Sequence, residues 1–344
     1  MLQKIKSNFI LGKIFLNIIE RRKLTLVAYN KNIQLNLGIK IIDFRRLSER
    51  YIIFEGKGKG EEYDSYGNNL IYKGTFVNGK RFNGNGKEYD KYFKKLIFEG
   101  EYLNGQRWEG WFTKYDKEGN KKFNCRYSKG KLDGEGQEYL ANKLIFDGHY
   151  LNGKRNGFGT EYDGYIYHLF KGQYCNGKRN GKGTEYNYKG CIIFEGNYSN
   201  GLRNGFGKEY NVNSELVFEG EYLNGHKKKG KYYIDDYLEF EGEYLFDKKW
   251  NGKGFDKDGK IEYELVNGNG KVKEYYFGEI GLVLIYEGEY LDGKKNGKAK
   301  EYNTFGRLIF EGEFLNGEKW NGKEIRYLDS FSFETEYING EIKL

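Results

Sequence analysis

The chain has 344 residues, with 58 Lys and Arg against 50 Asp and Glu, 50 Gly, no Pro and 18% aromatic residues. This aromatic content excludes an intrinsically disordered chain. No stretch reaches the ~18 apolar residues of a membrane-spanning helix. The three cysteines, Cys125, Cys175 and Cys191, lack the spacing of a zinc site, and their odd number favours a reducing compartment.

The first fifty residues differ from the rest in charge and pattern. They hold eleven Lys and Arg against three acidic residues and so carry the whole net charge of +8. Residues 5–19 and 21–39 predict two helices, the second ending near Gly38, and residues 41–54 predict a short third element, helical or extended. Lys13 interrupts the apolar run and no cleavage site comes after it, which argues against a signal peptide and favours the cytoplasm. We expect residues 1–50 to form a basic helical module that caps residues 51–344.

Residues 51–344 repeat one short sequence about twelve times. "FEGEYLNG" at Phe98 returns as "FDGHYLNG" at Phe146 and "FEGNYSNG" at Phe194, at intervals of 22 to 26 residues. A fixed period of this length predicts a stacked array of small units that share one core. The leading aromatic residues are Tyr72, Phe98, Phe123, Phe146, Phe170, Phe194, Phe218, Phe240, Tyr263, Tyr286, Phe310 and Phe333.

Each repeat can be interpreted as a β-hairpin. In "FEGEYL" the aromatic residues share one face with the Gly between them, while the acidic residues face the other way. Asn-Gly suits the tight turn, and it precedes a second strand such as "GFGKEY", whose final Tyr we expect on the ring-bearing face. Hairpins added edge to edge predict one long sheet. The expected fold class is mainly β: an elongated, single-layer β-hairpin repeat solenoid with a small N-terminal helical cap.

This pattern resembles the MORN repeat family. The residues that carry the resemblance are an aromatic residue, Gly two places later, a second aromatic residue, an Asn-Gly turn and a Gly-x-Gly strand: Phe146, Gly148, Tyr150, Gly153, Gly157 and Gly159, and again Phe194, Gly196, Tyr198, Gly201, Gly205 and Gly207. Four copies depart from it, through Cys125, through Leu265, through "GWF" at 110–112 and through Phe246-Asp247 in place of Asn-Gly. The resemblance implies a curved or twisted scaffold that works near membranes, the cell cortex or the cytoskeleton, and that in several relatives pairs end to end.

The chemistry-bearing residues favour no enzyme. "GKRNGKGTEY" at 177–186 lacks the order of a phosphate-binding loop. Carboxylate pairs such as Glu219 and Glu221 recur in unit after unit, which indicates a solvated charge ladder with the turn cations rather than an active site. We therefore expect no catalytic residue, cofactor or metal ion. A neutral repeat array also argues against nucleic acid as a partner.

Three functions remain open on the sequence. The first is a non-enzymatic scaffold for protein partners, with end-to-end homodimers as an option. The second is a peripheral platform for acidic phospholipids, in which the basic module makes the contact. The third is a ubiquitin-ligase adaptor, because residues 13–39 faintly resemble an F-box without its Leu-Pro start. The candidate lipid or partner contacts are Arg21, Arg22, Lys23, Arg45 and Arg46.

Overall fold

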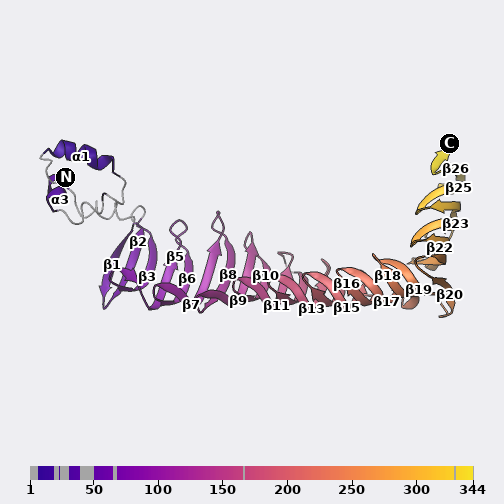
Figure 1. Ribbon diagram of the computed structural model, residues 1–344, viewed down its shortest axis with the longest axis horizontal. Helices are drawn as coiled ribbons and strands as arrows, with labels where there is room; N and C mark the ends of the chain where they lie inside the picture. Colours follow the sequence, from indigo (N-terminus) through magenta and orange to yellow (C-terminus); the bar gives the residue numbers. More distant parts are fainter. Residues whose placement is uncertain are drawn as a thin grey trace. The chain divides into compact units, whose positions relative to one another are not determined.

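The computed structural model describes residues 7–18, 23, 31–38, 50–64, 68–165, 167–328 and 331–343. The chain divides into two compact units, residues 1–154 and 155–344. Figure 1 shows that the strands within each unit succeed one another in chain order. Strands dominate both units, which confirms the predicted fold class of a β-hairpin repeat array.

The first unit contains two short helices and ten strands among its described residues. These elements are α1 (Asn8–Leu16), α3 (Lys31–Asn36), β1 (Arg50–Gly56), β2 (Lys59–Asp64), β3 (Leu70–Val77), β4 (Lys80–Arg81), β5 (Gly84–Tyr89), β6 (Leu96–Leu103), β7 (Gln106–Tyr115), β8 (Lys121–Ser128), β9 (Lys131–Leu140) and β10 (Lys143–Leu151).

The second unit is built from strands alone in its described part. These are β11 (Lys154–Tyr162), β12 (His168–Cys175), β13 (Lys178–Tyr186), β14 (Ile192–Ser199), β15 (Leu202–Tyr210), β16 (Leu216–Leu223), β17 (His226–Ile234), β18 (Tyr237–Leu245), β19 (Lys248–Phe255), β20 (Ile261–Leu265), β21 (Gly270–Gly278), β22 (Gly281–Leu291), β23 (Lys294–Tyr302), β24 (Leu308–Leu315), β25 (Glu318–Leu328), β26 (Phe331–Ile338) and β27 (Glu341–Lys343).

The N-terminal segment agrees with its prediction where it is described. Ser7 caps α1 by accepting a hydrogen bond from the backbone N–H of Ile10 at 3.4 Å. The second predicted helix is described only at residue 23 and over 31–38, and it ends with Gly38 at a φ of 61°, as expected. Residues 39–49 lie outside the described residues, and β1 is extended.

Antiparallel pairing of consecutive strands results from the hairpin turns. Asn200 and Gly201 have φ values of 52° and 93°, the left-handed conformation at both turn positions that a two-residue hairpin requires. The backbone N–H of Gly201 also donates to the carbonyl oxygen of Arg179 at 2.8 Å, which ties one turn to the preceding repeat. The same bond recurs from Gly177, Gly225 and Gly317, so neighbouring hairpins are fixed in register by backbone bonds.

The core is one layer of aromatic rings on one face of the sheet, which we call the ring face. Phe194 is completely buried and meets Tyr198 of its own repeat and Tyr222 of the next, with ring centroids 5.6 and 5.2 Å apart. Both contacts are edge-to-face, the arrangement that the ring quadrupoles favour. Phe170 and Phe218 repeat this geometry, so each ring belongs to two repeats at once.

Glycine is needed on the ring face because the strands approach closely beneath the rings. A Cβ atom at Gly220 would lie 2.3 Å from the carbonyl oxygen of Lys229 and 2.9 Å from Cζ of Phe218. Gly220 pairs with Gly230 across the ladder, as Gly196 pairs with Gly207. The Gly between two aromatic residues therefore makes room for the ring and for the neighbouring strand.

The prediction of one uninterrupted sheet was wrong for the second unit. Strands β21–β27 form a separate seven-stranded sheet, and β20 ends after five residues. The break falls in the copy where Leu265 replaces the first Gly. Leu265 is buried, pairs with Gly252 of β19 and is the last residue of β20. The departure noted in the sequence therefore marks a real interruption of the ladder.

A second departure from the repeat pattern tests whether the paired positions on the ring face require glycine. Ala299 stands where most copies have the second-strand Gly, and its partner across the ladder is Gly288. A Cβ atom added at Gly288 would lie 2.3 Å from Cβ of Ala299. We expect Gly288→Ala to lower the free energy of unfolding by about 1–3 kcal/mol, because the site becomes overpacked. Chemical denaturation would measure this loss.

The control is the exchanged pair, Gly288→Ala combined with Ala299→Gly. It removes the 2.3 Å contact between the two Cβ atoms but keeps the 2.8 Å approach of the residue 288 Cβ atom to the Tyr286 hydroxyl oxygen, so it should recover part of the lost stability. An exchanged pair that is no more stable than the single variant would contradict the interpretation that one Cβ atom is tolerated and two are not.

Candidate interaction surface

The ring face is closed by a ladder of charged side chains that the sequence analysis did not foresee. The guanidinium of Arg203 lies over the Phe194 ring, 4.0 Å from its centroid, and its Nη2 donates to Glu185 at 2.6 Å. Arg179 lies over Phe170 in the same way and bonds to both Glu161 and Glu185. Arginine and glutamate thus alternate from repeat to repeat, each side chain about a quarter exposed or less.

The ladder corrects one prediction, the place of the second-strand Tyr. The acidic residue before each second-strand Tyr lies on the ring face: Glu209 pairs with Phe218 and accepts a hydrogen bond from the Tyr222 hydroxyl at 2.9 Å. Tyr210 lies on the opposite face, where its hydroxyl donates to Glu195. The expectation that this Tyr joins the rings was therefore wrong, because strict alternation from Gly207 places residue 209, and not residue 210, beside them.

The opposite face of the sheet, which we call the groove face, is covered by lysine and glutamate. In the C-terminal sheet the cross-strand partners alternate in sign: Glu287 faces Lys300, and Lys300 faces Glu311. A glutamate of β22 is therefore followed, two strands further on, by a glutamate of β24. The predicted solvent-facing acidic residues are therefore present on this face, but their partners are strand lysines. The prediction that the turn cations pair with them was wrong for the arginines, because Arg179 lies over the Phe170 ring.

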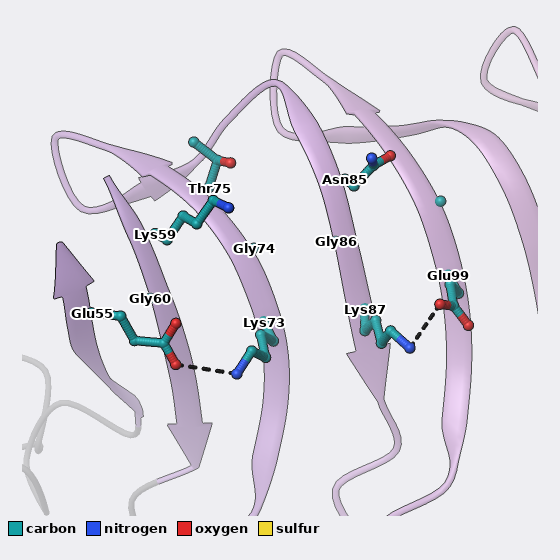
Figure 2. Close-up of a pocket in the computed structure, with 11 residues that line it drawn as sticks. Glu55, Lys59, Gly60, Lys73, Gly74, Thr75, Asn85, Gly86, Lys87 and Glu99 are labelled. Carbon is teal, nitrogen blue, oxygen red and sulfur yellow. Dashed lines mark hydrogen bonds and ion pairs between the residues drawn. The ribbon is translucent and has the colours of Figure 1, made fainter. Parts of the chain in front are cut away.

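Two hollows lie on the groove face, one in each unit. The first crosses β1, β2, β3, β5 and β6, and its lining includes Lys73, Lys87 and Glu99. Figure 2 shows that Lys73 and Lys87 extend from adjacent strands and that dashed lines join Lys73 to Glu55 and Lys87 to Glu99. The Lys87–Glu99 distance is 2.7 Å, with both side chains about half exposed. Such pairs contribute little to stability, since solvent screens them.

The second hollow crosses β20–β24. Its walls are two rows of charged side chains, and its floor is the main chain at Gly288, Ala299 and Gly312. The floor is bare because the side-chain positions of these three residues point to the ring face. The wall residues are Glu262, Lys271, Lys273, Glu287, Glu289, Lys298, Lys300, Glu311 and Glu313.

Hydrogen bonds fix the protonation of groups along both hollows. The hydrogen bond to Glu99 raises the pKa of Lys87, and that to Glu262 raises the pKa of Lys273, so both lysines stay charged. Desolvation and a 2.7 Å hydrogen bond to Glu287 raise the pKa of Tyr302 to about 12. These two lysines and this tyrosine therefore keep their protonation near neutral pH.

Within the described residues, no group of three or more His, Cys, Asp or Glu is placed to hold a metal ion. In that same part of the chain, no helix has the length and apolar character needed to cross a membrane. The predictions that the protein has no cofactor and is not an enzyme stay predictions.

Of the five basic residues predicted as lipid or partner contacts, only Lys23 is described. It is 8% exposed, and its Nζ lies 5.7 Å from the centroid of the Phe15 ring. Arg21, Arg22, Arg45 and Arg46 lie outside the described residues. Their role stays a prediction.

The twelve repeat-defining residues take the positions of a hairpin unit. Phe146, Tyr150, Phe194 and Tyr198 are buried. Four glycines lie in cross-strand pairs at the centre of the ladder, Gly148 opposite Gly136, Gly159 opposite Gly172, and Gly196 opposite Gly207. The remaining four, Gly153, Gly157, Gly201 and Gly205, have φ values between 75° and 93°.

Copies other than that of Leu265 that depart from the pattern keep the hairpin. Cys125 is buried in the position of a Gly and pairs with Phe112. Phe246 and Asp247 adopt φ values of 50° and 65°, so they form the two-residue turn without Gly. Asp247 supports it by accepting hydrogen bonds from the backbone N–H of Lys227 at 2.7 Å and from His226 at 2.6 Å.

The fold and its two faces define a β-hairpin repeat protein. The MORN repeat model matches residues 72–90, 146–164, 170–192, 194–214 and 286–303, so the chain carries MORN repeats and the predicted resemblance is confirmed. No match is found among curated proteins.

Solved structures show only distant likeness. TarM of S. aureus, in a complex with fondaparinux, is 13% identical with a TM-score of 0.21, and the match covers 42% of this chain and 27% of TarM. The Tc holotoxin pore of Photorhabdus luminescens is 10% identical with a TM-score of 0.18, covering 81% of this chain and 16% of that one. This chain therefore spans about a quarter or less of the length of either match. TM-scores this low do not indicate a shared overall fold.

Proposed function

We propose that this protein is a non-enzymatic scaffold that binds protein partners on its groove face. The supporting observation is the contrast between the two faces. The ring face is closed over its aromatic core by its own arginines, lysines and glutamates, as by Lys319 with Glu301 and Glu324 in the C-terminal sheet. The groove face, in contrast, offers partly exposed charges of both signs above a main-chain floor. Lys300 and Glu311, 3.5 Å apart, keep 44% and 58% of their side-chain surface exposed.

The test is affinity capture with in-cell cross-linking, comparing the full chain with a groove variant. In the variant Lys298 and Lys300 become Glu, which reverses one stripe of charge on an exposed face. The control reverses Lys117 and Lys257, two exposed residues in turns. We expect cross-links from partners to the groove face, lost in the groove variant and kept in the control. Identical cross-links from all three proteins would contradict the proposal.

Vesicle binding separates this scaffold from a lipid platform. A lipid platform would sediment with vesicles that contain acidic phospholipid, would be released by salt, and would lose binding when Arg21, Arg22 and Lys23 become Glu. The scaffold proposal expects no such binding.

A further inference from the structure

A pair of glutamates recurs on the groove face once in every repeat from the Phe218 repeat onward. The two members stand two residues apart on one strand, so both project from the same face. In the central strands the cross-strand partners of Glu241 are Lys231 and Lys253, and in the C-terminal sheet those of Glu311 are Lys300 and Lys323. The pairs are Glu219/Glu221, Glu241/Glu243, Glu262/Glu264, Glu287/Glu289, Glu311/Glu313 and Glu334/Glu336.

The lysines between these pairs are less regular. Their strands also hold two groove-face positions, but Asn251 replaces one lysine in β19 and Asn321 replaces one in β25. Some of these ion pairs join exposed side chains, as between Lys253 and Glu264 at 3.5 Å, with exposures of 52% and 58%, whereas the Glu262 side chain in the pair with Lys273 is only 16% exposed. Exposed pairs of this kind are worth about 0–1 kcal/mol, so they do not hold the carboxylates against a competing cation.

The spacing of one row of glutamates selects the conformation of a ligand that lies along the groove. Glu287, Glu311 and Glu336 lie in line across the C-terminal sheet, with Lys300 and Lys323 between them. Neighbouring strands are about 4.8 Å apart, and successive glutamates of this row are two strands apart, so they recur about every 9.6 Å. A polyproline II helix turns once in three residues and rises about 9.3 Å in doing so. An extended strand repeats its side-chain direction about every 6.8 Å, and an α-helix about every 5.4 Å. Of these three repeats, that of polyproline II matches the spacing of the row.

The chemistry of the contact favours arginine. The two carboxylates of one strand, such as Glu311 and Glu313, flank the bare main chain of Gly312. A planar guanidinium has five N–H donors in a fixed fork and binds carboxylates more specifically than an ammonium group does. The absence of any side chain above Gly312 leaves room for the stem of the incoming residue.

We propose that the groove face of β21–β26 binds a proline-rich segment in the polyproline II conformation with arginine at every third position. This proposal rests on the scaffold function and specifies the partner's chemistry. Glu287, Glu311 and Glu336, which lie in one row across the sheet, would each receive one arginine.

Two labelled peptides of equal composition test whether the arginine spacing of the ligand must match the glutamate spacing of the groove. One is (Pro-Pro-Arg)4, and the other holds the same residues with arginines alternately two and four positions apart. Both carry the same charge and favour the same backbone. With the full chain at about 0.15 M salt, we expect the in-phase peptide to bind about tenfold more tightly by fluorescence anisotropy, which corresponds to about 1.4 kcal/mol.

Variants locate the site. Glu311→Gln with Glu313→Gln should weaken the in-phase peptide about tenfold and leave the out-of-phase peptide nearly unchanged. Glu118→Gln with Glu279→Gln, which removes the same charge from exposed turns, should change neither, and circular dichroism of each variant verifies its fold. Equal affinity for the two peptides, an unaffected groove variant, or no binding at all would overturn the proposal. The cross-linking result for protein partners on the groove face does not depend on this outcome.

Discussion

Replacing Phe194 by Ala is expected to lower the free energy of unfolding of the second unit by about 3–5 kcal/mol, the range measured for buried aromatic residues. The loss is large because Phe194 serves two repeats. It has no exposed surface, it contacts Tyr198 and Tyr222 edge-to-face, and it supports the guanidinium of Arg203 at 4.0 Å. Denaturant titration monitored by tyrosine fluorescence would measure the change.

The matched control is Phe206→Ala in the same hairpin. Phe206 lies on the groove face and is 53% exposed. Its removal should change the stability by no more than about 0.5 kcal/mol. If the two variants cost the same, the aromatic residues would act as general hydrophobic surface, and the ring face would not be the core.

Most of the fold could be predicted because each feature has a local cause. The Asn-Gly turns, the alternation of "FEGEYL" and the fixed period determine the hairpins and the buried ring of each repeat. The Arg–Glu ladder was missed although its residues recur in the sequence. The turn cations were interpreted as partners of the solvent-facing acidic residues, because the position of a residue such as Arg179 over a ring depends on the neighbouring repeat.

The groove face was only partly predictable. Its acidic rows were expected on the solvent face, but the hollow at β20–β24 depends on where the sheet is interrupted. Leu265 marked that copy as unusual without indicating that pairing would stop there. The strand register that places Lys300 opposite Glu311 likewise depends on how two strands pair, and not on the sequence of either strand alone.

The buried ion pair at Glu239 could have been predicted by comparing the copies of the repeat with one another. Glu239 precedes Phe240, where the corresponding residues of other repeats are Ile193 and Val217. A carboxylate in an apolar position of a repeat requires a partner, since an unpaired buried charge is costly. That partner is Lys249, whose Nζ lies 2.6 and 2.5 Å from the two carboxylate oxygens, and the Tyr263 hydroxyl donates to the same group at 3.0 Å.

Lys249→Met is therefore expected to destabilise the second unit by about 3–5 kcal/mol, because it leaves a buried carboxylate without its counter-ion. The Glu239 side chain is 2% exposed, so water cannot replace the lost ammonium group without opening the core. Lys253→Met is the control, because it breaks the exposed pair with Glu264 and should cost no more than about 1 kcal/mol.

The second variant that identifies the cause is Lys249→Met combined with Glu239→Gln. A neutral amide still accepts the hydrogen bond from Tyr263 but carries no charge that needs a partner. If the large cost of Lys249→Met comes from the stranded charge, the double variant should be more stable than the single one by at least about 2 kcal/mol in thermal or denaturant unfolding. If the double variant is equally unstable, the contribution of Lys249 comes from the packing of its stem on the rings of Phe240 and Tyr263, from whose centroids its Nζ lies 5.2 and 5.8 Å away.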